Sequence, residues 1–154
     1  MRKTWMVIGG IVLSFFLIGT ALAGADGANV YKKCSICHKS NGEGTSGFYP
    51  PLAAHAPKLL SADRTYMVKV ILYGLEGEID AEGTTYKRKM RAFGDKLKDD
   101  EIAAVLNYVL GSWGNGKMLP EGHKEFTAAE VKALRGKKLT AEQVHEERQK
   151  LNLK

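Results

Sequence analysis

Two cysteines and a histidine form the group of residues in this sequence that is best suited to chemistry. They are Cys34, Cys37 and His38, in the stretch Cys-Ser-Ile-Cys-His. The two thiols lie on one helical turn, so both can add to vinyl groups of one porphyrin while the adjacent imidazole turns onto the iron. The chain has 2 cysteines in all, which excludes a four-cysteine zinc site and a disulfide network. The stretch therefore predicts covalent attachment of one haem.

Two other chemistries use a pair of cysteines at this spacing: thiol–disulfide exchange and a single structural disulfide. An exchange motif is expected after a strand, in a βαβ unit. Here the residues before Cys34 predict a helix, with Asp26 as its N-cap and with Gly27, Val30 and Tyr31 on its inward face. The pattern favours a first helix, residues 26–38, that ends in a haem-attachment site.

The ligand at the second axial position of such a haem decides between electron transfer and reactivity. A methionine thioether stabilises ferrous iron and leaves no open position for oxygen or peroxide. Met90 is the preferred candidate, because it lies in a loop from which its side chain can reach across the haem. Met67 falls on an inward helix face, where methionine is usually core filler, and Met118 lies beyond a helix end. If none of these methionines binds the iron, the position is filled by His55 or left vacant.

Residues 39–57 are rich in glycine and proline, which predicts a loop. A loop of this length in a small domain usually has a function. We expect it to wrap one side of the haem and to offer the carbonyl of Pro50 to the Nδ1 proton of His38. Such a contact decides which ring nitrogen faces the iron. The alternative is that the prolines only stiffen the loop.

The pattern after this loop is mostly helical. Ser61 can cap a helix that ends at Gly74, and residues 99–113 carry apolar side chains at helical spacing. The second of these predicts a core helix that packs on the first helix. Between the two helices, residues 82–83 have the sequence Glu-Gly, which predicts the turn of a small β-hairpin.

Residues 116–154 follow as a C-terminal extension. Within it, the segments 126–131 and 139–144 each combine a capping box with a hydrophobic staple, which predicts two short helices. The extension has a net charge of +3 and carries no set of residues that suggests chemistry. We expect it to pack on the haem domain, residues 24–115, as a clamp that raises stability; the alternative is a docking arm for a partner. The predicted fold class is all-α, with one small hairpin.

Residues 1–23 predict a signal peptide, with a basic start, an apolar run and the small-residue pattern Ala-Leu-Ala at the end. The alternative is an uncleaved anchor, because the apolar segment approaches the ~20 residues that span a membrane. Either way we expect export to the periplasm or the outer face of the cytoplasmic membrane, with membrane contact only if the segment is retained. The rest of the chain has 21 basic and 17 acidic residues, a net charge of +4. It shows no basic stripe, so nucleic-acid binding is not expected.

Residues 25–115 resemble a class I, low-spin cytochrome c. The resemblance is carried by the first helix with its Cys-x-x-Cys-His end, the Pro-Pro-Leu stretch at 50–52, the Met-Arg-Ala-Phe stretch at 90–93, and the helix with Tyr108 and Trp113. Arg91 stands where many relatives have proline after the ligand methionine. Together with the extension, the segments 73–75 and 103–108 are similar to the soluble, C-terminally extended monohaem cytochromes c of thermophilic bacteria.

The resemblance implies a small cytochrome c fold around one covalent haem c, with His38 and Met90 as axial ligands. It implies a respiratory electron carrier, not an enzyme, that takes electrons from a quinol-oxidising complex and delivers them to a terminal haem-copper oxidase. Two further function classes compete with it: a haem enzyme or gas sensor with an open sixth position, and a thiol–disulfide oxidoreductase. Lys87, Lys89 and Arg91 surround the ligand loop, so we expect a basic docking surface for an acidic partner, or else a merely solvated loop.

Overall fold

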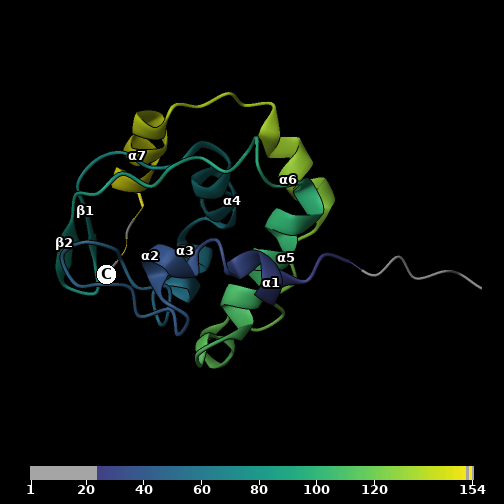
Figure 1. The fold of residues 1–154 in the computed structure, drawn as a ribbon, viewed down its shortest axis with the longest axis horizontal. Helices are drawn as coiled ribbons and strands as arrows, with labels where there is room; N and C mark the ends of the chain where they lie inside the picture. Colours follow the sequence, from purple (N-terminus) through teal and green to yellow (C-terminus); the bar gives the residue numbers. More distant parts are fainter. Residues whose placement is uncertain (1–23, 152, 154) are drawn as a thin grey trace, which may run out of the picture.

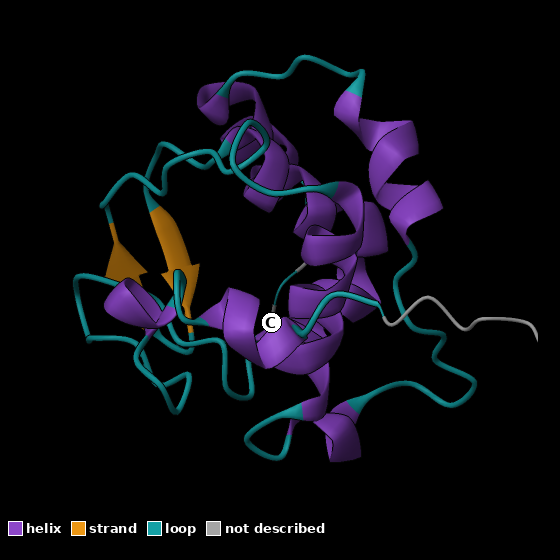
Figure 2. Ribbon diagram, turned by 45° about the vertical axis from the view of Figure 1, so that its right-hand side comes forward, coloured by secondary structure: helices purple, strands orange, loops and turns teal. Residues whose placement is uncertain are grey.

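The computed structural model describes residues 24–151 and 153, and the predicted signal segment 1–23 lies outside them. Among the described residues the regular structure is mainly helical, with one small antiparallel sheet, which confirms the predicted fold class. The elements are α1 (Gly27–Tyr31), α2 (Ser35–His38), α3 (Ala56–Ala62), α4 (Arg64–Tyr73), β1 (Ile79–Ala81), β2 (Thr84–Tyr86), α5 (Asp99–Gly111), the 3-10 helix η1 (Asn115–Met118), α6 (Ala128–Arg135) and α7 (Ala141–Gln149). Figures 1 and 2 show the two strands at one side of the molecule and most of the helices at the other. No helix within residues 24–151 is long and apolar enough to cross a membrane.

The predicted first helix is divided into α1 and α2. Asp26 caps α1 as expected, since its carboxylate accepts from the amides of Ala28 and Asn29. The helix then tightens, because the amides of Lys33 and Cys34 donate to carbonyls three residues back. The haem-attachment cysteines thus lie at the start of α2 and within it, and not at the end of one continuous helix.

The prediction that Ser61 caps a helix is wrong. Pro57 lies in the first turn of α3, so a separate helix forms there, and the Ser61 hydroxyl donates to the Pro57 carbonyl inside it. Asp63 has an extended backbone that separates the two helices, and its carboxylate accepts from the Thr65 amide at the start of α4. The side chain that caps the longer helix lies two residues beyond the one expected.

Helix α5 forms the centre of the main core and packs on α1, as the sequence predicted. The two helices approach so closely at Gly27 that a Cβ there would lie 2.2 Å from the Ala104 carbonyl oxygen. Further along, the Tyr31 ring contacts Tyr108 and Trp113, with centroids 5.3 and 5.0 Å away. The glycine allows backbone contact, and the aromatic cluster then continues the packing towards the haem-attachment residues.

The hairpin is also confirmed. Ile79 pairs with Tyr86 and Ala81 with Thr84, so Glu-Gly at 82–83 forms a two-residue turn. Both turn residues have positive φ, 49° and 74°, as this tight turn requires. The inward side chains Ile79, Ala81 and Tyr86 form a second, smaller core with Tyr66 and Val144.

Both capping boxes in the C-terminal extension are present, at Thr127 and Thr140. Helix α6 packs on α5 and α4, and α7 packs on α4, along the upper edge of the molecule in Figure 1. Each buries one valine completely, Val131 in α6 and Val144 in α7. The extension therefore contributes to both hydrophobic cores.

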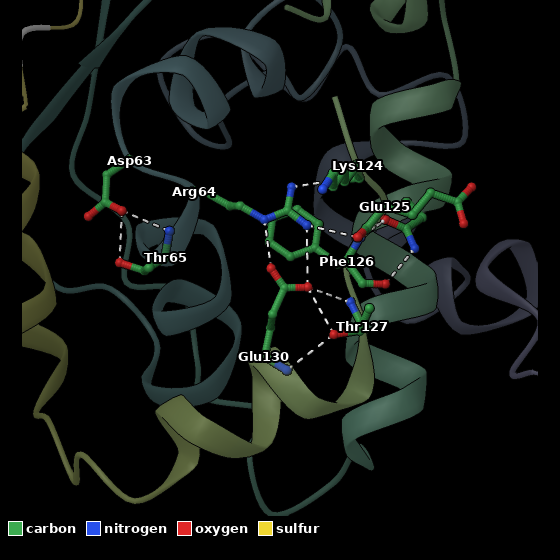
Figure 3. Close-up of polar contacts among 9 residues, drawn as sticks. Asp63, Arg64, Thr65, Lys124, Glu125, Phe126, Thr127 and Glu130 are labelled. Atoms are coloured by element: carbon green, nitrogen blue, oxygen red, sulfur yellow. Dashed lines mark hydrogen bonds and ion pairs between the residues drawn. The ribbon is translucent and has the colours of Figure 1, made fainter. Parts of the chain in front are cut away.

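A polar cluster holds the start of α6 against α4 (Figure 3). The Arg64 guanidinium lies 3.8 Å from the centre of the Phe126 ring, and its Nε donates to Glu130 at 2.8 Å. It also donates to the carbonyls of Lys124 and Glu125. At the other end of α6, Arg135 pairs with Asp99 and donates to the carbonyls of Gly94 and Leu97. One arginine thus anchors each end of the α6 segment.

Candidate haem site

A cavity of about 550 Å³ lies between the two cores, within the size range of ligand pockets. Its walls come from α2, the loop at 49–52, α3, α4, the hairpin, the segment around Met90, and α5. Arg148 of α7 completes the lining. Most of these wall residues are apolar, so the cavity suits a large, flat, mainly apolar group.

The three residues of the attachment motif line this cavity together. Cys34 and Cys37 are partly buried, while the His38 side chain is buried. Burial raises the pKa of the Cys34 thiol to about 11. A thiol that exchanges disulfides needs a lowered pKa, so this environment does not suit an oxidoreductase.

The imidazole of His38 is held by the loop that follows it. Its Nδ1 lies 2.8 Å from the carbonyl oxygen of Pro50, the contact expected from the sequence. Burial lowers the pKa of His38 despite this hydrogen bond, which favours a neutral ring that donates from Nδ1 and keeps a free electron pair on Nε2. The loop needs glycine at Gly44, where φ is +66° and a Cβ would lie 2.3 Å from the Tyr49 carbonyl.

Met90 lines the same cavity from a different segment of the chain. Its backbone forms two hydrogen bonds with Leu75, of 2.9 and 3.0 Å. Gly74 allows this pairing, since its φ is +81° and a Cβ there would lie 2.5 Å from the Met90 carbonyl oxygen. Met67 is buried and also lines the cavity, whereas Met118 is 46% exposed and lies outside it.

His55 lines the cavity as well, but both of its ring nitrogens are engaged. Nδ1 lies 3.0 Å from a carboxylate oxygen of Glu82, and Nε2 lies 3.1 Å from Nη2 of Arg148. Nδ1 therefore carries the proton and Nε2 accepts from the arginine. Burial keeps the pKa of His55 below its ordinary value, in agreement with a neutral ring.

Two residues near the site were not predicted from the sequence. Arg148 is buried against the cavity, although it lies in a charged C-terminal helix. Asn115 is fully buried; its side chain accepts from the Ala54 amide and donates to the carbonyls of Leu52 and Val109. Asn115 follows Gly114 at a helix end, and this pattern indicates only a helix stop.

The basic residues expected at the partner surface are exposed, but two of them have acidic neighbours. Lys87 pairs with Glu78 at 2.7 Å, and Lys89 pairs with Glu76. The Arg91 guanidinium lies 5.8 Å from the centre of the Phe93 ring. The two ion pairs reduce the positive charge that the lysines present to a partner.

These residues fit a covalently held haem. Two thiols lie on one wall, a buried neutral imidazole is fixed by a carbonyl, and a thioether comes from another segment. Apolar side chains form the remaining walls, among them Val70, Ile71, Val105, Leu106 and Val109. The arrangement would hold a porphyrin by two thioether bonds and supply both a nitrogen and a sulfur ligand to its iron.

The comparisons with known proteins agree with this geometry. The family model described as Cytochrome c matches residues 24–113. The chain is 49% identical over 146 residues to a cytochrome c-552 of Thermus thermophilus, which covers 93% of this chain and 97% of that protein. A second Thermus thermophilus cytochrome c-552 is 50% identical over 132 residues, 84% of this chain and 99% of the relative. The gluconate 2-dehydrogenase cytochrome c subunit of Pantoea cypripedii is 35% identical over 112 residues, 71% of this chain and 24% of that subunit.

Proposed function

The chain belongs to the cytochrome c family and binds one covalent haem c, and from this premise we propose a monohaem carrier that passes single electrons in a respiratory chain. Cys34 and Cys37 would hold the haem through thioether bonds, and His38 and Met90 would bind its iron. The Pro50 carbonyl holds the imidazole through Nδ1, which leaves Nε2 available to bind the iron. A haem held by these residues would supply one-electron redox chemistry, and the residues that hold it would need little rearrangement.

The observation that carries this proposal is the arrangement of His38 and Met90 at one cavity. The imidazole is fixed by a hydrogen bond to a carbonyl, and the methionine backbone is fixed by a two-bond bridge to Leu75. Both side chains line the cavity from segments held by hydrogen bonds, so each could bind the iron of a haem there, which would leave no open position for oxygen or peroxide.

A haem enzyme or gas sensor would need an open axial position and, for peroxidase chemistry, a free acid–base group. His55 is the candidate for that group, yet Glu82 and Arg148 occupy both of its ring nitrogens. This supports the carrier over the reactive classes.

Absorption spectra of the exported protein, from a host that attaches haem, test the axial ligands. The oxidised wild type should show a weak band near the red edge of the spectrum, and the reduced form should exclude carbon monoxide. Met90→Ala should lose the band and bind carbon monoxide, while Met118→Ala, at an exposed methionine outside the cavity, should match the wild type. A high-spin wild-type spectrum, or one indifferent to Met90, would favour an enzyme or sensor.

We propose that the protein is exported to the periplasm or the outer face of the cytoplasmic membrane. There it would accept electrons from a quinol-oxidising complex and deliver them to a terminal haem-copper oxidase. Support comes from the apolar segment at 1–23 and from the resemblance to extended carriers. Oxidation of the reduced protein by an isolated oxidase, measured by stopped flow, tests the acceptor.

The docking surface proposed for these partners includes Lys87, Lys89 and Arg91. Reversing Lys87 and Lys89 to glutamate should lower the association rate and weaken its dependence on salt. A matched control reverses Lys137 and Lys138, which are exposed and lie outside the haem cavity, and should leave both quantities nearly unchanged. If the two double variants behave alike, charge at the ligand loop does not steer association.

We also propose that residues 116–154 act as a clamp on a haem domain of residues 24–115. The contacts of Arg64 with Glu130 and of Arg135 with Asp99 support this, as do the two fully buried valines. A chain that ends at Asn115 should melt at a lower temperature. An unchanged melting temperature with lost oxidase turnover would instead indicate a docking arm.

A further inference from the structure

Arg148 is a buried cation with no anionic partner among the residues that the structure describes. Its exposed fraction is 6%, and it lies in α7, in the C-terminal extension. Within residues 24–151, no carboxylate forms an ion pair with it. A buried charge without a counter-charge is strongly unfavourable, so such a group normally has a partner.

The hydrogen bonds of Arg148 engage only some of the donors of its guanidinium. Nη2 donates to the Asp80 carbonyl at 2.9 Å and to Nε2 of His55 at 3.1 Å. Both acceptors are uncharged. One is a backbone carbonyl, and the other is Nε2 of a neutral His55, whose proton is on Nδ1 and faces Glu82. Among the described residues, Nε and Nη1 have no hydrogen bond. The two uncharged contacts orient the guanidinium and leave donors free beside the haem cavity, which Arg148 lines.

A second unpartnered polar group lines the same cavity. The hydroxyl of Tyr66, on α4, is buried and is the one buried side-chain oxygen or nitrogen without a hydrogen bond among the described residues. The Arg148 guanidinium lies 6.0 Å from the centre of this ring. Burial raises the pKa of Tyr66 although the nearby Arg148 guanidinium acts to lower it, so the hydroxyl keeps its proton and can donate it. A cation and a hydroxyl donor thus face one space.

We propose that Arg148 and Tyr66 bind a carboxylate of the haem, one of its propionates, so that the C-terminal extension forms part of the cofactor site. The inference rests on the proposed attachment of haem in this cavity. A propionate would supply the missing negative charge, accept from the free guanidinium donors in the paired geometry that arginine favours, and accept from the tyrosine hydroxyl. His55 acts as a positioning residue, because it holds Nη2 and not the carboxylate.

The charge of Arg148 should keep this propionate ionised to lower pH than the other propionate. The titratable groups around the site come from each element packed there: His55 just before α3 and Lys58 within it, Tyr66 and Lys69 of α4, Asp80 of β1, Glu82 of the hairpin turn, and Glu147 of α7. Glu82 pairs with Lys58, and Glu147 pairs with Lys69, so neither acid is free to neutralise Arg148.

Isotope labelling of the two haem carboxyls provides a direct test on the holoprotein. Growth on 5-aminolevulinic acid labelled with ¹³C in its carboxyl group places the label in the propionates, and NMR of the reduced protein follows each carboxyl against pH. In the wild type one carboxyl should titrate at lower pH than the other. Arg148→Gln should move that titration to higher pH and lower the reduction potential. Arg148→Lys, which keeps a positive charge, should shift both quantities by less.

Arg135→Gln is the matched control, since Arg135 also anchors the extension but lies outside the cavity. It should lower the melting temperature and leave both propionate titrations in place. If Arg148→Gln also leaves them in place while the spectrum keeps its His–Met bands, the inference is wrong and the proposed function stands. Absence of the attached haem or of those bands in the wild type would instead count against the proposed function itself.

Tyr66→Phe gives a second test, because the two possibilities predict different changes in the melting temperature. If the hydroxyl donates to a propionate, its removal should lower the melting temperature of the holoprotein. If the hydroxyl has no partner, removing a buried unsatisfied group should leave the melting temperature unchanged or raise it, and the tyrosine part of the inference fails.

Discussion

Replacement of Asn115 by alanine should destabilise the whole haem domain, although Asn115 touches neither the attachment motif nor the ligand loop. The side chain is fully buried at the start of η1. It accepts from the Ala54 amide at 2.7 Å, and it donates to the carbonyls of Leu52 and Val109 at 3.2 and 2.8 Å. It therefore ties the end of α5 to the loop that carries Pro50.

The magnitude follows from these three contacts. A hydrogen bond contributes about 1 kcal/mol, and groups left unsatisfied inside the protein make its loss more costly. Asn115→Ala removes three bonds and leaves the buried Ala54 amide without its partner, while the carbonyls of Leu52 and Val109 still accept from the Ala56 and Ser112 amides. From the three lost bonds we expect a loss of roughly 3 kcal/mol in the free energy of unfolding. For a domain of this size that corresponds to a melting temperature about 10 °C lower.

Denaturant unfolding followed by haem absorption and by circular dichroism measures this loss. Asn41→Ala is the control, because Asn41 is exposed and its side chain accepts a local 3.3 Å hydrogen bond from the Glu43 amide. The control should change the free energy of unfolding by less than about 0.5 kcal/mol. If Asn115→Ala behaves like the control, the loop does not depend on the buried amide and our reasoning about its support is refuted.

Three further changes test the packing and the electrostatics of the fold. Gly27→Ala places a Cβ 2.2 Å from the Ala104 carbonyl oxygen, so thermal unfolding should show a loss of about 1–3 kcal/mol. Thr140→Ala removes the cap of α7 and should cost roughly 1 kcal/mol in the same assay. The hydrogen bond from Arg64 lowers the pKa of Glu130 to about 2, so Glu130 stabilises the folded state above its unfolded pKa of roughly 4.3, and this stability is lost as the pH falls towards 2. Glu130→Gln should therefore have a lower free energy of unfolding than the wild type at neutral pH, by under about 1 kcal/mol because the carboxylate is partly exposed. Near pH 2 the two proteins should be equally stable.

The features that were predictable from the sequence are those with local causes. The Asp26 cap, both capping boxes and the hairpin turn each depend on residues within a few positions of one another. The packing of α5 on α1 was also predictable, because periodic apolar positions and one glycine define the two faces. These elements place the motif around Cys34 and the loop after it.

Where two local signals competed, the sequence alone did not decide between them. Ser61 and Asp63 are both good capping residues, and Pro57 further along the loop can start a helix of its own. The structure uses the proline and the aspartate, so the serine falls inside α3. The division of the first helix has a similar origin, since the same apolar spacing suits one helix or two with a tight turn between them.

The buried polar contacts of Asn115 and Arg148 with distant segments could not be predicted. Asn115 meets Leu52 across 63 positions, and Arg148 meets His55 across 93. In sequence one looks like a helix stop and the other like an exposed charge among charged neighbours. Only the folded chain brings them to buried positions, where an amide or a guanidinium must find partners.

The C-terminal extension is consequently more than an addition to a finished domain. The family pattern ends at residue 113, yet the second core includes Val144, and the cavity wall includes Arg148. Both side chains lie on α7, one turn apart, so the valine that seals the core also determines where the guanidinium lies. A change that loosens α7 should therefore alter the electrostatic environment of the haem as well as stability, whereas a purely external clamp would alter stability alone.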